Sequence, residues 1–270
     1  MDETATDTSY PSLKDEGPFP SPGQDEYAGN CWDYSHTSAL ITESAEMIQL
    51  QVTGIDKPVH AVHKSLLCFY SKYYDAALNG PYAEAKKTSF TVRCSANALA
   101  LFISWLYTGS LGSVEREQDP GYRYFLGSFL PLYVLADQIE VLALRRDVLT
   151  HLQLSAVEGD RSQPPMDCKV LQYTLKHLPV SSPMRDWLVD TYAHHWDSGS
   201  GGFVSDGDMR SIPADFLCQV LNGMARDKNG MMAEMSSDFT CIKPDCSCCF
   251  DICQYHEHQD EEEQEASKQL

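Results

Sequence analysis

Three runs of sequence decide the fold: MIQLQV at residues 47–52, VHAVHKSLLCFYSKYYDAAL at 59–78 and FTVRCSANALALFISWLYTGSL at 90–111. The first run alternates apolar and polar residues, which predicts a half-buried strand, and the start of the second run predicts its hairpin partner. The third run predicts a short strand and then a helix that is apolar almost all round, which is typical of a central helix. Together they predict a small sheet covered by helices.

Further helices are predicted on both sides of these strands. Ser71 separates two short helical segments and has the residue type of an N-cap for the second. Residues 129–136 (FLPLYVLA) predict the start of another helix, with Pro131 in its first turn, where a proline is tolerated. Residues 141–152 predict its partner. We expect this helical hairpin to close the unit.

Short motifs recur in order along these strands and helices. Their residues are His63, Lys64, Leu67, Ser71, Tyr74, Tyr107, Thr108, Gly109, Ala136 and Asp137. In this succession they resemble the pattern of a BTB/POZ domain. The resemblance covers about residues 46–152 and implies an α+β fold, in which a small sheet is capped by helices and followed by a closing helical hairpin. The resemblance is specific for the fold and only weakly specific for function.

The chain after the BTB/POZ domain, which we assign to residues 45–153, is predicted to be helical. Residues 164–235 form an all-α extension, similar to the region that follows the BTB fold in many fungal BTB proteins. Its helices are expected from amphipathic patterns in three stretches, residues 167–178, 183–196 and 213–225.

The two ends of the chain are predicted to be disordered tails. Residues 1–44 are acidic and rich in Pro, Gly and Ser, without an apolar period. Residues 236–270 combine a Cys/His-rich segment with an acidic tail. The net charge of the 270 residues is −19, to which residues 1–46 contribute −9 and residues 254–270 contribute −5. The rest of the chain is therefore only mildly acidic.

The amino-acid composition limits which partners and which cellular compartment we expect for the protein. Lys and Arg form no basic stripe, so we expect no nucleic-acid partner. The first thirty residues lack a secretory signal and no stretch is apolar enough for a membrane span, so no membrane association is expected. Ten Cys without a signal peptide favour reduced thiols in an intracellular protein of the cytoplasm or nucleus.

Tyr82 and Glu84, in the polar loop before the third strand, are the candidate protein-binding residues. An exposed aromatic ring can anchor in a pocket of a partner while an acid faces a basic rim. In BTB proteins that act as substrate adaptors for cullin-type ubiquitin ligases, a hydrophobic-x-acidic tripeptide at this place contributes to cullin contact. The resemblance therefore implies a cullin-binding role for Tyr82 and Glu84.

The C-terminal segment contains a candidate zinc site formed by Cys246, Cys249, Cys253 and His256. The two doublets have the spacing of zinc knuckles, but only three residues separate them, which leaves little chain to wrap a tetrahedral ion. A solvated acidic tail is favoured over zinc, so we expect no metal and no cofactor. Many fungal BTB proteins end in similar Cys/Tyr/His-rich tails, which keeps a metal-stabilised binding protein open as the alternative.

The sequence favours a protein-interaction module over an enzyme. It contains no Gly-rich phosphate loop, no G-x-S-x-G and no H-E-x-x-H motif. An enzyme whose site is assembled from distant residues stays a further alternative. The resemblance implies a cullin scaffold or a second copy of the chain as partner. The family dimerises through its first strand and an N-terminal helix, and residues 1–44 predict no such helix, which argues against a domain-swapped dimer.

Overall fold

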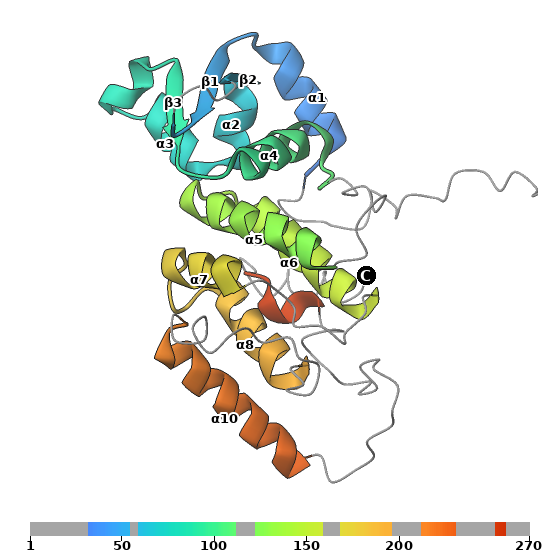
Figure 1. Ribbon diagram of the computed structural model, residues 1–270. Coiled ribbons are helices and arrows are strands. Elements are labelled where there is room, and N and C mark those ends of the chain that lie inside the picture. Colours follow the sequence, from blue (N-terminus) through green and yellow to red (C-terminus); the bar gives the residue numbers. More distant parts are fainter. Residues whose placement is uncertain are drawn as a thin grey trace, which may run out of the picture.

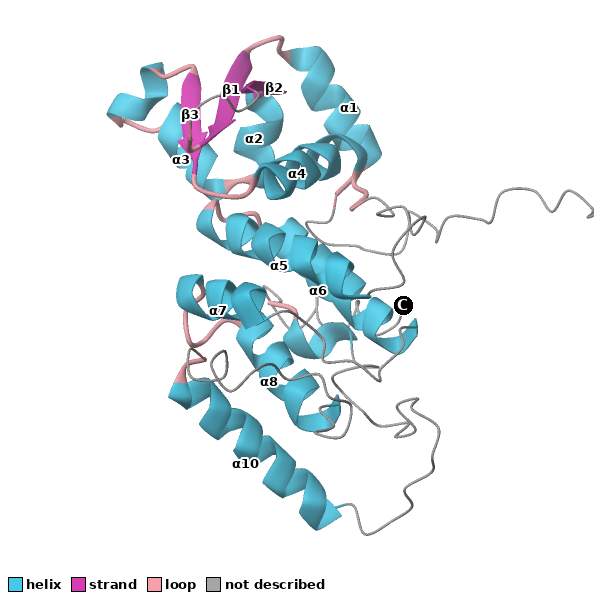
Figure 2. Ribbon diagram, viewed as in Figure 1, coloured by secondary structure: helices cyan, strands magenta, loops and turns pink. Residues whose placement is uncertain are grey.

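The computed structural model of the protein, shown in Figures 1 and 2, is a mixed α+β structure. It describes residues 32–54, 59–111, 122–158, 168–195, 212–230 and 252–257. Within these residues there are one three-stranded sheet and nine α-helices. The sheet and the first four helices form one end of an elongated molecule, and the later helices continue away from it in successive layers (Figure 1).

The sheet has the strand order β2-β1-β3. Strand β1 (Met47–Val52) pairs antiparallel with β2 (Val59–His63) and parallel with β3 (Ser89–Val92). Alternate residues of β1 point into the core, as the alternation in the sequence predicts. The expected hairpin and the expected third strand are thus confirmed. The buried side chains of the sheet are those of Ile48, Leu50, Val52, Val62, Phe90 and Val92.

Ser71 fixes the junction between helices α2 (Lys64–Tyr70) and α3 (Lys72–Asn79). Its hydroxyl oxygen accepts a hydrogen bond from the backbone N–H of Tyr74 at 3.1 Å, which satisfies one of the free donors at the start of α3. The same hydroxyl donates to the carbonyl of Ile139 at 2.5 Å. Ser71 is fully buried. The predicted N-cap therefore also ties α3 to a turn 68 residues further along the chain.

Helix α4 (Ala96–Thr108) is the central helix that the sequence predicts. Ser95 caps its N-terminus by accepting the N–H of Ala98 at 3.1 Å, and Gly109 ends it in the left-handed conformation. Four large side chains on this helix are almost fully buried: Leu99, Phe102, Trp105 and Leu106.

A row of buried polar and aromatic contacts runs through four helices. The indole N–H of Trp105 donates to Asp147 Oδ2 at 2.7 Å, on α6 (Leu142–Glu158). The ring of Trp105 meets the ring of Tyr70 edge-on, with centroids 5.3 Å apart. The hydroxyl of Tyr70 lies 2.8 Å from Thr37 Oγ1 on the first helix. These contacts hold α6, α4, α2 and the first helix, α1 (Tyr34–Glu43), together.

Helix α1 (Tyr34–Glu43) corrects the expectation that residues 1–44 are disordered. The helix is packed against the rest of the fold. Just before it, Trp32 Nε1 donates to the carbonyl of Leu106 at 3.1 Å, and within it Thr37 is 2% exposed. The expectation that no helix precedes the first strand is wrong, so the argument against a domain-swapped dimer loses its premise. Residues 1–31 lie outside the described residues.

Replacing Gly109 by alanine is expected to lower the free energy of unfolding by about 2 kcal/mol. Gly109 has φ +65°, and a Cβ there would collide with the indole ring of Trp32. Urea unfolding measures the loss. In a Trp32→Ala background the collision is absent, so the same change should cost only the backbone term of about 1 kcal/mol. Equal losses in the two backgrounds would contradict the close approach of Trp32.

Helices α5 (Tyr122–Gln138) and α6 form the closing hairpin. The start of α5 differs from the expectation, because Pro131 lies inside the helix and not in its first turn. A proline inside a helix removes one backbone hydrogen bond, and burial of the surrounding side chains offsets that loss. The side chains next to the proline that are fully buried are Phe129, Leu130, Leu132 and Tyr133.

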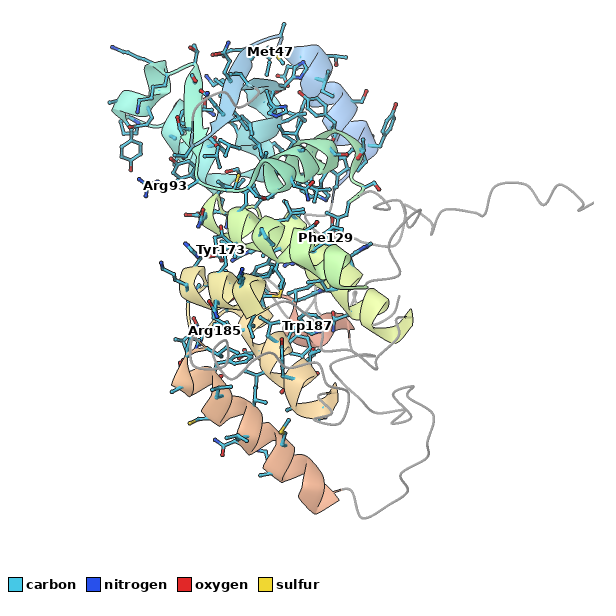
Figure 3. The ribbon with its side chains drawn as sticks, viewed as in Figure 1. Met47, Arg93, Phe129, Tyr173, Arg185 and Trp187 are labelled. Carbon is cyan, nitrogen blue, oxygen red and sulfur yellow. The ribbon has the colours of Figure 1, made fainter. Side chains whose placement is uncertain are left out.

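The extension consists of α7 (Cys168–His177), α8 (Pro183–His195), α10 (Ala214–Gly230) and a short 3₁₀ turn, η3 (Ile252–Tyr255). The three α-helices agree with the predicted stretches. Figure 3 shows Trp187 and Arg185 on α8. The buried apolar residues form one cluster from the sheet to the extension, so the hydrophobic core is continuous between the two parts.

Candidate functional site

The loop that carries Tyr82 and Glu84 is a 3₁₀ turn, η1 (Ala83–Lys86), between α3 and β3. It lies at the margin of the molecule beside β3 (Figure 1). The turn is held by backbone hydrogen bonds from Ala85 N to Tyr82 O at 3.1 Å and from Lys87 N to Glu84 O at 2.8 Å. These two hydrogen bonds hold the backbone of the turn that carries the two side chains.

The side chain of Tyr82 is free to meet a partner. The residue is 59% exposed, although a tyrosine ring is a large apolar group. Tyr73, on the helix against which η1 packs, is 43% exposed. Exposed aromatic residues on a rigid element supply contact area at a low entropy cost, and such residues are enriched at the centres of protein interfaces.

Glu84 already has a partner within its own loop. Lys87 Nζ lies 3.0 Å from Glu84 Oε1, and this hydrogen bond lowers the pKa of the Glu84 carboxyl below its usual value. The carboxylate is therefore ionised at neutral pH. An ion pair at the surface contributes little to stability, so a cationic group of a partner can replace Lys87 without a large loss.

The structure describes two of the four candidate zinc ligands, Cys253 and His256. Cys253 is 7% exposed, and His256 Nε2 lies 3.0 Å from Thr150 Oγ1. Cys246 and Cys249 lie outside the described residues. Within the described ranges, no three Cys, His, Asp or Glu side chains are grouped so that they could hold a metal ion. Zinc analysis of the purified chain tests the alternative, since a structural site would retain close to one equivalent.

The segment around these two residues is not the solvated tail that the sequence predicts. Residues 252–257 pack between α6 and α8, where the short turn η3 is drawn in red in Figure 1. Tyr255 is 3% exposed, and its hydroxyl donates to Asp190 Oδ2 on α8 at 2.7 Å. For this segment the expectation of an acidic disordered tail is corrected. Burial of the Tyr255 ring favours ordering.

Arg145 and Arg146, on α6, hold the end of the same segment. Arg145 Nη2 lies 2.9 Å from Glu257 Oε2, and Arg145 Nη1 lies 2.8 Å from Asp137 Oδ1. The guanidinium group of Arg146 donates to the backbone carbonyl of Glu257, from Nε at 3.1 Å and also from Nη2. No pattern in the sequence pairs either arginine with Glu257, which lies more than a hundred residues further along the chain.

His63 has a structural position at the junction of the sheet and the central helix. Its Nδ1 lies 2.8 Å from the hydroxyl of Tyr107, and its backbone N–H donates to the same hydroxyl at 3.1 Å. These bonds connect the end of β2 to α4. His63 therefore joins the sheet to the central helix.

No family model and no curated protein matches the chain. Function is therefore inferred from the residues of the chain and from their geometry. Among the helices that the structure describes, none combines the length and the apolarity needed to cross a membrane.

Proposed function

We propose that the protein is a non-enzymatic protein-interaction module of the BTB/POZ type and a substrate adaptor for a cullin-type ubiquitin ligase. The positions of the motif residues support this assignment. Ser71 caps α3, Tyr107 bonds to His63, Gly109 ends the central helix, and Asp137 pairs with α6 in the closing hairpin. Each of these residues thus has a structural role that accounts for its place in the motif.

The observation that carries the adaptor role is the exposed ring of Tyr82 beside the ionised carboxylate of Glu84 on one rigid turn. A partner with an apolar pocket would bury the ring, and a basic group at the rim of that pocket would take the place of Lys87. Burial of a large aromatic side chain is typical of the residues that dominate binding energy.

Replacing Tyr82 by alanine is expected to weaken binding of a purified cullin N-terminal region at least about tenfold, because the anchor is lost. Glu84→Lys is expected to weaken it as well, since the reversed charge would face the basic rim. Binding of the full-length chain is measured by calorimetry. Light scattering of the wild-type chain alone tests the second partner, another copy of itself.

Tyr34→Ala is the matched control, because Tyr34 is 70% exposed and lies on α1, away from the loop. It should bind the cullin with the affinity of the wild type. The adaptor proposal is wrong if the wild-type chain does not bind a cullin, or if Tyr82→Ala and Tyr34→Ala bind equally well.

A further inference from the structure

The surface that holds residues 252–257 is formed by two helices from distant parts of the chain. We call this surface, which consists of Arg145, Arg146, Thr150 and Asp190, the tail site. The first three residues are on α6 and Asp190 is on α8. Both helices contact η3, which is the red turn in Figure 1.

The contacts at the tail site resemble those of a bound peptide. Tyr255 is the anchor, since its ring is buried and its hydroxyl reaches the carboxylate of Asp190. A tyrosine is favoured at interfaces when its ring is shielded from water and its hydroxyl has a hydrogen-bond acceptor. Cys253, two residues earlier, is also buried. The segment thus offers an apolar centre to the helices.

A polar rim surrounds this anchor. His256 is hydrogen-bonded to the hydroxyl of Thr150, and the carboxylate of Glu257 forms an ion pair with the guanidinium group of Arg145. Arg146 donates to the backbone carbonyl of Glu257, so the tail site binds the main chain of the segment as well as its side chains. A buried aromatic centre with a polar, charge-matched rim is the usual anatomy of a specific interface.

The segment reaches the tail site as a tethered ligand. Helix α10 ends at Gly230 and η3 begins at Ile252, so the residues numbered 231–251 connect the two. A tether of about this length gives an attached ligand an effective concentration on the order of 1 mM. An untethered peptide with the same contacts must compete with that concentration.

We propose that the tail site is a peptide-binding site whose resident ligand is the chain's own segment 252–257, and that its external ligand is a peptide with a tyrosine followed two positions later by an acidic residue. The tyrosine would fill the place of Tyr255 and donate to Asp190. The acidic side chain would take the place of Glu257 at Arg145. This site is separate from Tyr82 and does not depend on the adaptor role.

The probe is a fluorescein-labelled synthetic peptide with the sequence of residues 250–260, and its binding to the full-length chain is followed by fluorescence anisotropy. Tyr255→Ala in the chain removes the anchor of the resident segment. This variant is expected to bind the peptide at least about tenfold more tightly than the wild type does, because the tethered competitor is weakened. A peptide with phenylalanine in place of its tyrosine should bind more weakly than the parent peptide.

Two further variants make the result specific. Glu257→Ala removes only the ion pair with Arg145 and should give a smaller gain in peptide affinity; it serves if Tyr255→Ala does not fold, as judged by circular dichroism. Adding Asp190→Asn to Tyr255→Ala, whose resident segment no longer uses this acceptor, should reverse much of the gain, since the acceptor of the peptide's tyrosine hydroxyl loses its charge. Tyr34→Ala is the control for loss of a tyrosine and should leave peptide affinity unchanged.

The proposal is overturned if the folded variants bind the peptide no more tightly than the wild type, or if Asp190→Asn has no effect on peptide binding by the Tyr255→Ala variant. Residues 252–257 would then be a fixed part of the fold.

Discussion

Replacing Trp105 by alanine is expected to lower the free energy of unfolding by about 4 kcal/mol. Trp105 is fully buried on the central helix, and its ring packs edge-on against Tyr70. Removing the indole leaves a cavity in the middle of the core. It also takes away the N–H that donates to Asp147. Both losses act in the same direction.

Urea unfolding of the two proteins at pH 7.5 measures this loss. Trp105→Phe is the matched variant, because it keeps an aromatic ring in the core and removes the N–H donor. Its expected cost is about 2 kcal/mol, since the half-buried carboxylate of Asp147 loses its hydrogen bond. That cost should shrink at pH 4, where the Asp147 carboxyl is protonated. A loss below about 1 kcal/mol for Trp105→Ala would contradict the central position of this residue.

The sheet and the central helix could be predicted from the sequence because local pattern and tertiary environment agree there. Alternation in β1 matches a sheet with one buried face, and Ser95 and Gly109 mark the two ends of α4 with residue types that suit a cap. In these elements the residues that the pattern makes apolar are those that the core requires. Periodicity alone was therefore sufficient.

Helix α1 could not be predicted, because its stability comes from residues far along the chain. Thr37 is the buried residue of this helix and is polar, and the apolar Leu40 and Ile41 beside it are only partly buried, so the apolar stripe on its inner face is short. The hydroxyl of Thr37 is satisfied by Tyr70, and the indole of Trp32 by the carbonyl of Leu106. A single sequence gives no sign of such pairings. The start of α5 was missed for a related reason, since packing overrides the local effect of Pro131.

The candidate site could be predicted only in part. Tyr82 and Glu84 were assigned to a loop, and the structure has them on an exposed turn. The pairing of Glu84 with Lys87, three residues on, follows a spacing that the sequence displays. The contacts of the tail site join residues separated by more than a hundred positions, such as Thr150 and His256. Neither periodicity nor motif spacing indicates contacts between residues that are so far apart in the sequence.

Replacing Asp147 by asparagine is expected to stabilise the protein at neutral pH by up to about 3 kcal/mol. Burial raises the pKa of this carboxyl from 3.8 to about 6, against smaller opposing effects of the Trp105 hydrogen bond and the charge of Arg146. Between pH 4 and pH 6 the native state therefore binds more protons than the unfolded state. The contribution of Asp147 to the free energy of unfolding falls as the pH rises through this window.

The asparagine variant should lack this fall, because its side chain stays neutral and its amide oxygen can still accept the indole N–H of Trp105. Urea unfolding of both proteins from pH 4 to pH 8 should give nearly equal stabilities at pH 4 and a gap that opens up to pH 6 to 7 and then stays constant. Asp75→Asn, the same change at an exposed position of α3, should alter stability by less than about 0.5 kcal/mol throughout. A gap that is independent of pH would show that the carboxylate of Asp147 is ionised in the native state across this range, and that burial does not raise its pKa.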